Sequence, residues 1–463
     1  MKVVPGRRNC RWTADSVSLK TLMARFLFSC WSFPGHFYPS LAVALALRAQ
    51  GHECAFYSGP RAARVLQDEN IPHFAFRNID EDTLYEIVFG SEHARSVDWR
   101  GTPQFIKMGR QWMLDTIPQQ VTDLQQAMAD WRPDVLITDP TFWGPLLVLW
   151  EKYEIPVAIL TIGCCMLPGP DAPPFGLGLP PPRNWHTRLL SWVATRGTDI
   201  MAAGFRRHAN EIRRQYGLPP LETSVTQFTG TVPLYLVPCT PEFDYQRRDL
   251  PPSVHYVGPC VWTKPRHEPP ADWLQQLPHD RPWVHATEGT IHVQEPLVLR
   301  AAAQGLANLP MYVILSTGGN REPADLNIGP IAPNVRAVRW VSHSELLPQL
   351  DLMITTGGAA TTLATLAAGV PMIIIPTEWD KPEMAQRAVA TGAALRLSPK
   401  NCSPARLRAA VEHILSTPSF RQNARRMAEI FARYRGPAAA AELLEELAGL
   451  SRDRKGALNT ASS

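Results

Sequence analysis

The chain has 463 residues, a mass of 51.6 kDa and a formal net charge of +4, and 45% of its residues are hydrophobic. This length suits two or three domains, and the apolar content excludes a largely disordered chain. No run approaches the roughly 18 consecutive apolar residues of a membrane-spanning helix. No basic cluster indicates a nucleic-acid partner.

The sequence of residues 1–23 predicts an N-terminal extension without fixed structure. It carries three arginines but lacks the apolar stretch of a secretory signal. Met23 directly precedes a strand-like run and is therefore a candidate start residue. The eight cysteines contain no C-x-x-C pair and no histidine at zinc spacing. We therefore expect free thiols in a cytoplasmic protein.

The next region alternates strand and helix patterns. Ala24–Cys30 predicts a buried strand, Trp31–Pro39 a loop, and Ser40–Gln50 a helix that ends before Gly51. A strand, a helix and a second strand in this order form a βαβ unit. Further strands of the same sheet are expected at Glu53–Tyr57, Asp134–Thr138 and Pro156–Thr161.

The same alternation returns after residue 280 and predicts a second α/β half with buried parallel strands. The expected strands are Trp283–Ala286, Met311–Leu315, Val335–Trp340, Asp351–Thr355 and Pro371–Ile375. The expected helices are Glu295–Asn308, Thr361–Ala368, Pro382–Thr391 and further helices over 403–447.

Proline, with 44 residues, is about twice as frequent as usual. Seven prolines lie in 168–182, which predicts a long loop of the first half, and eleven lie in 233–282, which predicts a connector. The expected organisation is an extension (1–23), a first domain (24–237), a linker (238–280), a second domain (281–440) and a tail (441–463).

Two candidate catalytic residues follow predicted strands of the first half, where ligands of open α/β sheets bind. His36 lies in Trp-Ser-Phe-Pro-Gly-His-Phe-Tyr-Pro, and Asp139 follows Asp134–Thr138. A carboxylate that fixes the tautomer of an imidazole makes the imidazole a suitable general base. A surface histidine and a turn aspartate before proline are the alternatives.

A glycine-rich segment, Thr355–Thr362, follows a predicted strand of the second half and opens a helix. Its glycines allow a ligand to approach the backbone, and the helix start offers N–H groups and a positive dipole end. This suits a diphosphate held without a metal, and a plain glycine-rich turn is the alternative.

Two further strand-end segments of the second half could contact a ligand. Asp380 lies in Pro-Thr-Glu-Trp-Asp-Lys-Pro-Glu, where carboxylates suit hydrogen bonds to sugar hydroxyls. Trp340 ends a predicted strand, where an aromatic ring can stack on a nucleobase. A helix start and ordinary packing are the respective alternatives.

In order and spacing, these motifs resemble the family-1 inverting glycosyltransferases, the UDP-glycosyltransferase superfamily, over roughly residues 24–440. The chain is most similar to the bacterial branch that decorates macrolides, enediynes, indolocarbazoles and other secondary metabolites. The segments that carry the resemblance best are His-Ala-Thr-Glu-Gly-Thr, Arg-Trp, Thr-Thr-Gly-Gly-Ala-Ala-Thr-Thr, Ala-Ala-Gly-Val-Pro and Asp-Lys-Pro-Glu. The resemblance implies an α/β protein with the GT-B fold, in which two Rossmann-like domains with parallel sheets face each other across a cleft.

The resemblance also implies residue roles. His36 would be the catalytic base and Asp139 its orienting carboxylate. Residues 24–237 would bind the acceptor, and residues 281–440 would bind the nucleotide sugar. The implied donor contacts are Thr290, Trp340, His343, Thr356, Gly357, Gly358, Thr361, Thr362, Asp380 and Lys381. The aromatic residues of the first domain suggest a flat apolar acceptor, and the candidate contacts, some of which could instead be core, are Phe33, Phe37, Phe142 and Trp143.

Four positions depart from the family pattern. One is His343, which stands where a glutamine often follows the tryptophan. Thr356 replaces the usual histidine before the glycine pair, and Ala364 stands where many members place a ribose-binding glutamate. Lys381 replaces a glutamine at the donor sugar, which leaves the preferred sugar nucleotide open.

The expected function is therefore inverting transfer of a hexose or deoxyhexose from a UDP- or TDP-sugar to a hydrophobic natural-product acceptor. The sugar nucleotide is a co-substrate, and no metal or other cofactor is expected. We expect no nucleic-acid partner and no stable membrane insertion. The alternatives are a non-catalytic protein that partners another glycosyltransferase, and a nucleotide-sugar 2-epimerase.

Overall fold

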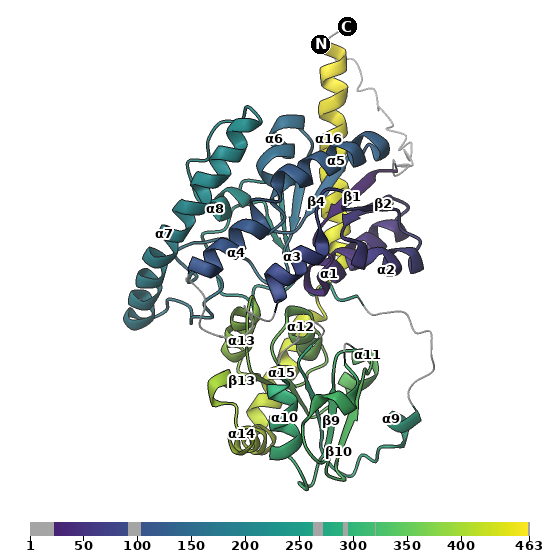
Figure 1. Cartoon of the computed structure of the whole chain (residues 1–463), viewed down its shortest axis with the longest axis vertical. Helices are drawn as coiled ribbons and strands as arrows, with labels where there is room; N and C mark the ends of the chain where they lie inside the picture. Colours follow the sequence, from purple (N-terminus) through teal and green to yellow (C-terminus); the bar gives the residue numbers. More distant parts are fainter. Residues whose placement is uncertain (1–22, 91–102, 263–271, 290–294, 320, 462–463) are drawn as a thin grey trace, which may run out of the picture.

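The computed structural model describes the backbone of residues 23–90, 103–262, 272–289, 295–319 and 321–461, with side chains up to residue 449. Two β-sheets, one above the other in Figure 1, divide these residues into a first and a second half. All strand pairs in both sheets are parallel. The predicted α/β class with two parallel sheets is confirmed.

The first half contains a seven-stranded sheet in the order β3-β2-β1-β4-β5-β6-β7. Its strands are β1 (Arg25–Ser29), β2 (Glu53–Ser58), β3 (His73–Ala75), β4 (Val135–Thr138), β5 (Val157–Leu160), β6 (Leu234–Val237) and β7 (Val254–Tyr256). Its helices are α1 (Pro34–Ala49), α2 (Ala63–Asp68), α3 (Glu81–Phe89), α4 (Pro103–Met113), α5 (Ile117–Trp131), α6 (Trp150–Tyr153), α7 (Trp185–Gln215) and α8 (Val225–Thr229).

The second half contains a six-stranded sheet in the order β10-β9-β8-β11-β12-β13. Its strands are β8 (Trp283–Thr287), β9 (Tyr312–Ser316), β10 (Val335–Val338), β11 (Leu352–Thr355), β12 (Met372–Ile374) and β13 (Ala394–Arg396). The helices from here to the end of the chain are α9 (Asp272–Gln276), α10 (Leu297–Gly305), α11 (His343–Leu346), α12 (Ala359–Ala367), α13 (Lys381–Ala390), α14 (Pro404–Ser416), α15 (Pro418–Phe431) and α16 (Pro437–Ala461).

Both faces of each sheet are covered, which explains the continuous apolar strand patterns. In β1, Phe26 and Phe28 pack with α1 on one face, while Leu27 packs with α5 on the other. This alternation follows from the period of two along a strand. The core around Leu27 continues into the second half and includes Met353 of β11.

The helix α1 begins six residues earlier than predicted, at Pro34 rather than Ser40. Proline at the first helical position is favourable because its φ is already helical and its missing N–H has no partner there. Pro39 also lies inside the helix without ending it. His36 therefore lies in the first turn of a helix, not in a loop.

The boundary between the two halves also differs from the prediction. The expected linker, 238–280, contains β7, whose Val254 pairs with Tyr235 of β6 and so belongs to the first sheet. A three-residue strand between prolines carries too little pattern to predict. Residues 263–271 of the expected linker, and 1–22 of the expected extension, lie outside the described residues.

The expected tail, 441–463, is mostly helical, because α16 runs from Pro437 to Ala461. In Figure 1 this helix (yellow) lies along the first half. Ala440, Ala441 and Leu444 are fully buried in the core that also contains Leu41 of α1. The end of the chain therefore returns to the first half, where its apolar face covers the first sheet.

Candidate active site

A cavity of about 1770 Å³ lies between the two halves and is lined by residues from both. The loops that follow β1, β4 and β5 contribute from the first half, and those that follow β8, β11 and β12 contribute from the second. The proline-rich loop 168–182 also borders it.

His36 and Asp139 meet at this cavity. His36 Nδ1 lies 3.4 Å from Asp139 Oδ2, and the exposed fractions of the two side chains are 12% and 1%. His36 lines the cavity. Because Nδ1 faces the carboxylate, Nε2 is the ring nitrogen left for a ligand. The predicted proximity of the two residues is confirmed.

The turn interpretation of Asp139 is also correct, because its two oxygens serve different partners. Oδ1 accepts hydrogen bonds from Thr141 N at 2.8 Å and from Thr141 Oγ1 at 2.6 Å. Oδ2 accepts a long one, 3.4 Å, from Trp31 N. These bonds hold the carboxylate in place while Oδ2 faces the imidazole.

Only two of the four predicted acceptor contacts line the cavity. Phe33 and Trp143 do, whereas Phe37 and Phe142 are buried in the core. Phe142 stacks at a tilt on Trp31, with ring centroids 4.6 Å apart. The assignment of Phe37 and Phe142 to the acceptor site is therefore wrong.

The early start of α1 explains the error for Phe37. In a helix that begins at Pro34, Phe37 lies on the same face as Leu41 and Ala44, at spacings of four and seven residues. All three pack into the core between α1 and the first sheet.

Trp379 was not predicted as a site residue, although it lies beside the candidate Asp380. It comes from the second half and meets Trp112 of α4 edge to face, with ring centroids 5.6 Å apart. Both rings line the cavity, and Trp112 also lies 6.2 Å from the His36 ring. The signal in the sequence was an aromatic residue beside a strand-end carboxylate.

The glycine-rich segment forms the start of α12 at the cavity. Gly358 and Thr361 line the cavity. Gly357 supplies the turn, with φ at +89°, and a Cβ there would lie 2.6 Å from Ile374 Cγ2. The first N–H groups of a helix have no partner inside it, so the start of α12 presents such groups at the cavity, and a diphosphate bound there stays a prediction.

Two threonines of this segment differ from the prediction. Thr362 lies on the buried face of α12, is 0% exposed and does not line the cavity. Thr356 does line it, but its Oγ1 donates a hydrogen bond of 3.1 Å to the carbonyl of Glu288. The hydroxyl proton of Thr356 therefore already makes a hydrogen bond within the protein and is not available to a ligand.

The donor candidates of three further segments line the cavity: Trp340, His343, and the pair Asp380 and Lys381. Trp340 lies two residues beyond β10 and is 55% exposed. His343 begins α11, and burial lowers its pKa. Lys381 Nζ donates to Thr377 Oγ1 at 2.9 Å and lies 3.4 Å from Glu378 Oε1, beside Asp380. Thr290 lies outside the described residues.

Glu288 is a second residue that the sequence did not single out. It follows β8 and lines the cavity, yet it is 6% exposed. Burial raises the pKa of its carboxyl group to about 7, although Oε1 accepts a hydrogen bond of 2.7 Å from Val298 N.

The described part of the chain contains neither a candidate metal cluster nor a candidate membrane-spanning helix. There, no three His, Cys, Asp or Glu side chains gather as a metal site requires, and the expectation that no metal takes part stays a prediction. Among the described helices, none has the length and apolar character needed to cross a membrane. The seven described cysteines are free thiols, and Cys10 lies outside the described residues.

Comparison with known proteins identifies related sequences. Residues 304–447 match the C-terminal domain of the family described as erythromycin biosynthesis protein CIII-like. The chain is 32% identical over 428 residues to 4'-demethylrebeccamycin synthase of Lentzea aerocolonigenes, an alignment that covers 92% of this chain and 99% of the relative.

Solved structures share the fold. The calicheamicin glycosyltransferase CalG4 aligns with a TM-score of 0.69 and 23% identity, over 92% of this chain and 99% of its own. The glycosyltransferase VinC in complex with DTDP aligns with a TM-score of 0.66 and 21% identity over the same shares. The predicted GT-B fold is confirmed.

Proposed function

The chain belongs to the glycosyltransferases of antibiotic and other natural-product biosynthesis, and we propose that it inverts the anomeric carbon of the sugar it transfers. The donor is a UDP- or TDP-linked hexose or deoxyhexose, and the acceptor is a hydrophobic natural product. The observation that carries this proposal is the His36–Asp139 pair at the cavity between the two halves.

In the proposed reaction, His36 Nε2 takes the proton from a nucleophilic group of the acceptor. The nucleophile attacks the anomeric carbon of an α-linked sugar, and the bond to the nucleoside diphosphate breaks with its electron pair on the departing phosphate oxygen. Asp139 stabilises the imidazolium that forms. A single in-line displacement of this kind produces a β-glycoside.

The donor site lies in the second half. The start of α12 places N–H groups and the positive end of a helix dipole at the cavity, which stabilises the charge that develops on the diphosphate. Because the Thr356 hydroxyl donates to Glu288, we assign this stabilisation to the backbone. Trp340 stacks on the base, and Asp380 and Lys381 bind sugar hydroxyls. The DTDP complex of VinC supports a TDP-linked donor.

The acceptor side of the cavity is aromatic. Phe33, Trp112, Trp143 and Trp379 line the cavity, and the rings of Phe33 and Trp112 lie beside His36. Such rings suit a flat apolar acceptor. The similarity to 4'-demethylrebeccamycin synthase supports a natural product as the acceptor. No residue of this proposal requires a metal ion.

The test is a panel of UDP- and TDP-sugars with aromatic acceptors, in which product mass and the anomeric coupling constant are measured. We expect a β-glycoside from an α-linked donor, and an α-glycoside would contradict inversion. His36→Ala should lower kcat by about 10²–10⁴-fold while nucleotide binding persists. His208→Ala is the matched control. His208 Nε2 lies 2.7 Å from Asp115 Oδ1, as in a histidine–aspartate pair, but neither residue lines the cavity.

The same assays separate the alternatives. A non-catalytic partner protein would yield no glycoside with any donor, and a 2-epimerase would change the donor in the absence of acceptor. The aromatic acceptor side of the cavity favours transfer over both.

A further inference from the structure

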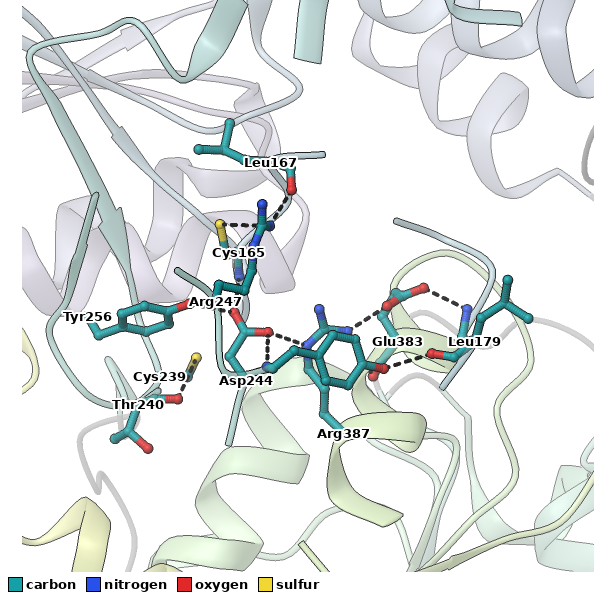
Figure 2. Close-up of polar contacts among 12 residues, drawn as sticks. Cys165, Leu167, Leu179, Cys239, Thr240, Asp244, Arg247, Tyr256, Glu383 and Arg387 are labelled. Atoms are coloured by element: carbon teal, nitrogen blue, oxygen red, sulfur yellow. Dashed lines mark hydrogen bonds and ion pairs between the residues drawn. The ribbon is translucent and has the colours of Figure 1, made fainter. Parts of the chain in front are cut away.

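Three charged side chains are buried together where the two halves meet (Figure 2). Asp244 comes from the first half, and Glu383 and Arg387 come from α13 of the second. Arg387 Nε lies 2.8 Å from Asp244 Oδ1, and Arg387 Nη1 lies 2.5 Å from Glu383 Oε2. All three residues are less than 7% exposed. One guanidinium therefore bridges a carboxylate from each half.

Glu383 also holds the proline-rich loop of the first half. Its Oε1 accepts hydrogen bonds from Gly176 N at 3.0 Å and Gly178 N at 2.6 Å. Arg396 of β13 donates from Nη1 to the Gly178 carbonyl at 2.8 Å. Loop 168–182 borders the cavity on the first half, so the second half anchors a segment of the acceptor side.

Asp244 is held equally firmly by its own half. Its Oδ2 accepts from Cys165 N at 2.9 Å and from Tyr256 Oη at 3.1 Å, and Oδ1 accepts from Tyr245 N at 2.8 Å. The Arg387 guanidinium carbon lies 4.2 Å from the centre of the Tyr245 ring. The Arg387 guanidinium therefore binds a carboxylate and an aromatic ring whose positions are already fixed by the first half.

The two halves touch closely at the starts of α12 and α13. A Cβ on Gly178 would lie 2.6 Å from Pro382 Cβ, one residue beyond Lys381. A Cβ on Gly163, in the loop after β5, would lie 2.6 Å from Ala359 Cβ, at the start of α12. Any relative movement of the halves would therefore displace the elements assigned to the diphosphate and the sugar.

Arg387 itself lines no part of the cavity, and neither do Asp244 and Glu383. Burying three charges is unfavourable unless they are paired, and an apolar replacement is often as stable. Such a cluster is thus better suited to defining one arrangement of the halves than to adding stability.

From this geometry we propose that Arg387 is a positioning residue for sugar transfer. By bridging Asp244 and Glu383, it holds the two halves closed and keeps loop 168–182 in register with the start of α13. This inference rests on the proposed function, since closure matters because acceptor and donor bind opposite halves.

The first test uses two variants that keep most of the packing. Glu383→Gln retains an oxygen for Gly176 and Gly178 but presents an amide donor to Arg387. Arg387→Lys keeps the charge, yet one ammonium cannot replace a guanidinium that reaches two carboxylates. We expect kcat to fall about 10²-fold, because small misplacements of bound reactants have effects of this size. UDP or TDP affinity should change less than about twofold, because the nucleotide contacts only the second half.

The second readout is opening of the interface, reported by native thiols. Cys164 and Cys165 are 3% exposed, and the backbone N–H of Cys165 donates a hydrogen bond to Asp244 Oδ2. Labelling with a thiol reagent, located by peptide mass, should be faster in Glu383→Gln and Arg387→Lys than in the wild type. Cys54, equally buried in the core beneath α1, should stay unlabelled, which separates opening from unfolding.

Arg213→Lys is the matched control. Arg213 is 1% exposed and lies 2.7 Å from Glu151, but both residues belong to the first half. Its loss should lower the melting temperature without faster labelling at Cys164 and without a selective fall in kcat. A neutral triple variant, Asp244→Asn with Glu383→Gln and Arg387→Met, covers the case in which a single variant does not fold.

Wild-type kcat in folded Arg387→Lys and Glu383→Gln, with labelling of Cys164 as slow as in the wild type, would overturn the proposal. So would a triple variant that is folded, closed and fully active. Failure of the proposed function has a different signature, because the wild type would then transfer no sugar while the labelling contrast at Cys164 persisted.

Discussion

Asp139 divides its carboxylate between two tasks: Oδ1 is held by Thr141, while Oδ2 lies 3.4 Å from His36 Nδ1. The carboxylate is 1% exposed, so its position does not depend on solvent. An anchored carboxylate beside one imidazole nitrogen orients the other nitrogen toward the cavity.

We predict that Asp139→Asn lowers kcat by about 10²-fold or more while the fold is kept. The amide can retain the bonds to Thr141, but an N–H group facing His36 Nδ1 favours the tautomer that carries its proton on Nε2, which cannot act as a base. Thr141→Val is the control, because it loses the hydroxyl bond to Oδ1 and should lower stability by about 1 kcal/mol. A Thr141→Val variant as slow as Asp139→Asn would contradict this division of tasks.

The adjacent glycines Gly357 and Gly358 should respond differently to alanine. Gly357 has φ at +89° and no room for a Cβ, so Gly357→Ala should lower the free energy of unfolding by about 1–3 kcal/mol. Gly358 has open space around it and an ordinary φ of −59°. Gly358→Ala should keep stability but weaken UDP or TDP binding, measured by calorimetry. Unchanged affinity in Gly358→Ala would argue against a diphosphate at this backbone.

Trp340 is largely exposed, so its removal should affect ligand binding rather than folding. If its ring stacks on the nucleobase, Trp340→Ala should weaken nucleotide binding by about 1–3 kcal/mol, with little change in melting temperature. Trp185→Ala is the control, because Trp185 is 67% exposed on α7 and does not line the cavity. Equal nucleotide affinities in the two variants would show that Trp340 takes no part.

Glu288 should make stability depend on pH. Burial raises its pKa from 4.5 to about 7, so between these values the folded state holds a proton that the unfolded state has lost. Its contribution to stability is fully present below pH 4.5 and is lost as pH rises through 7.

Glu288→Gln should therefore gain stability relative to the wild type by up to about 3 kcal/mol between pH 4.5 and 8. Urea unfolding at several pH values measures the difference. Glu412→Gln, at an exposed position of α14, is the control. If the free energies of unfolding of the wild type and Glu288→Gln changed in parallel with pH, the raised pKa of Glu288 would be contradicted.

Local patterns were sufficient to predict the α/β class and most strands, because buried parallel strands are short apolar runs whatever they pack against. They also placed His36, Asp139 and the glycines before α12 at strand ends, where parallel sheets bind ligands. Such signals lie within a few neighbouring residues, so one sequence contains them completely.

Only the tertiary structure decided which surfaces meet. The apolar residues of α16 do not by themselves indicate that this helix covers the first sheet. Likewise, Phe33 and Phe37 cannot be told apart in the sequence, because only the observed start of α1 places one at the cavity and the other in the core. Arg387 and Asp244 are 143 residues apart, and the sequence near either residue does not indicate that the two pair. Contacts of this kind depend on how the two halves pack, and the cavity, its lining and the buried charges between the halves follow from that packing.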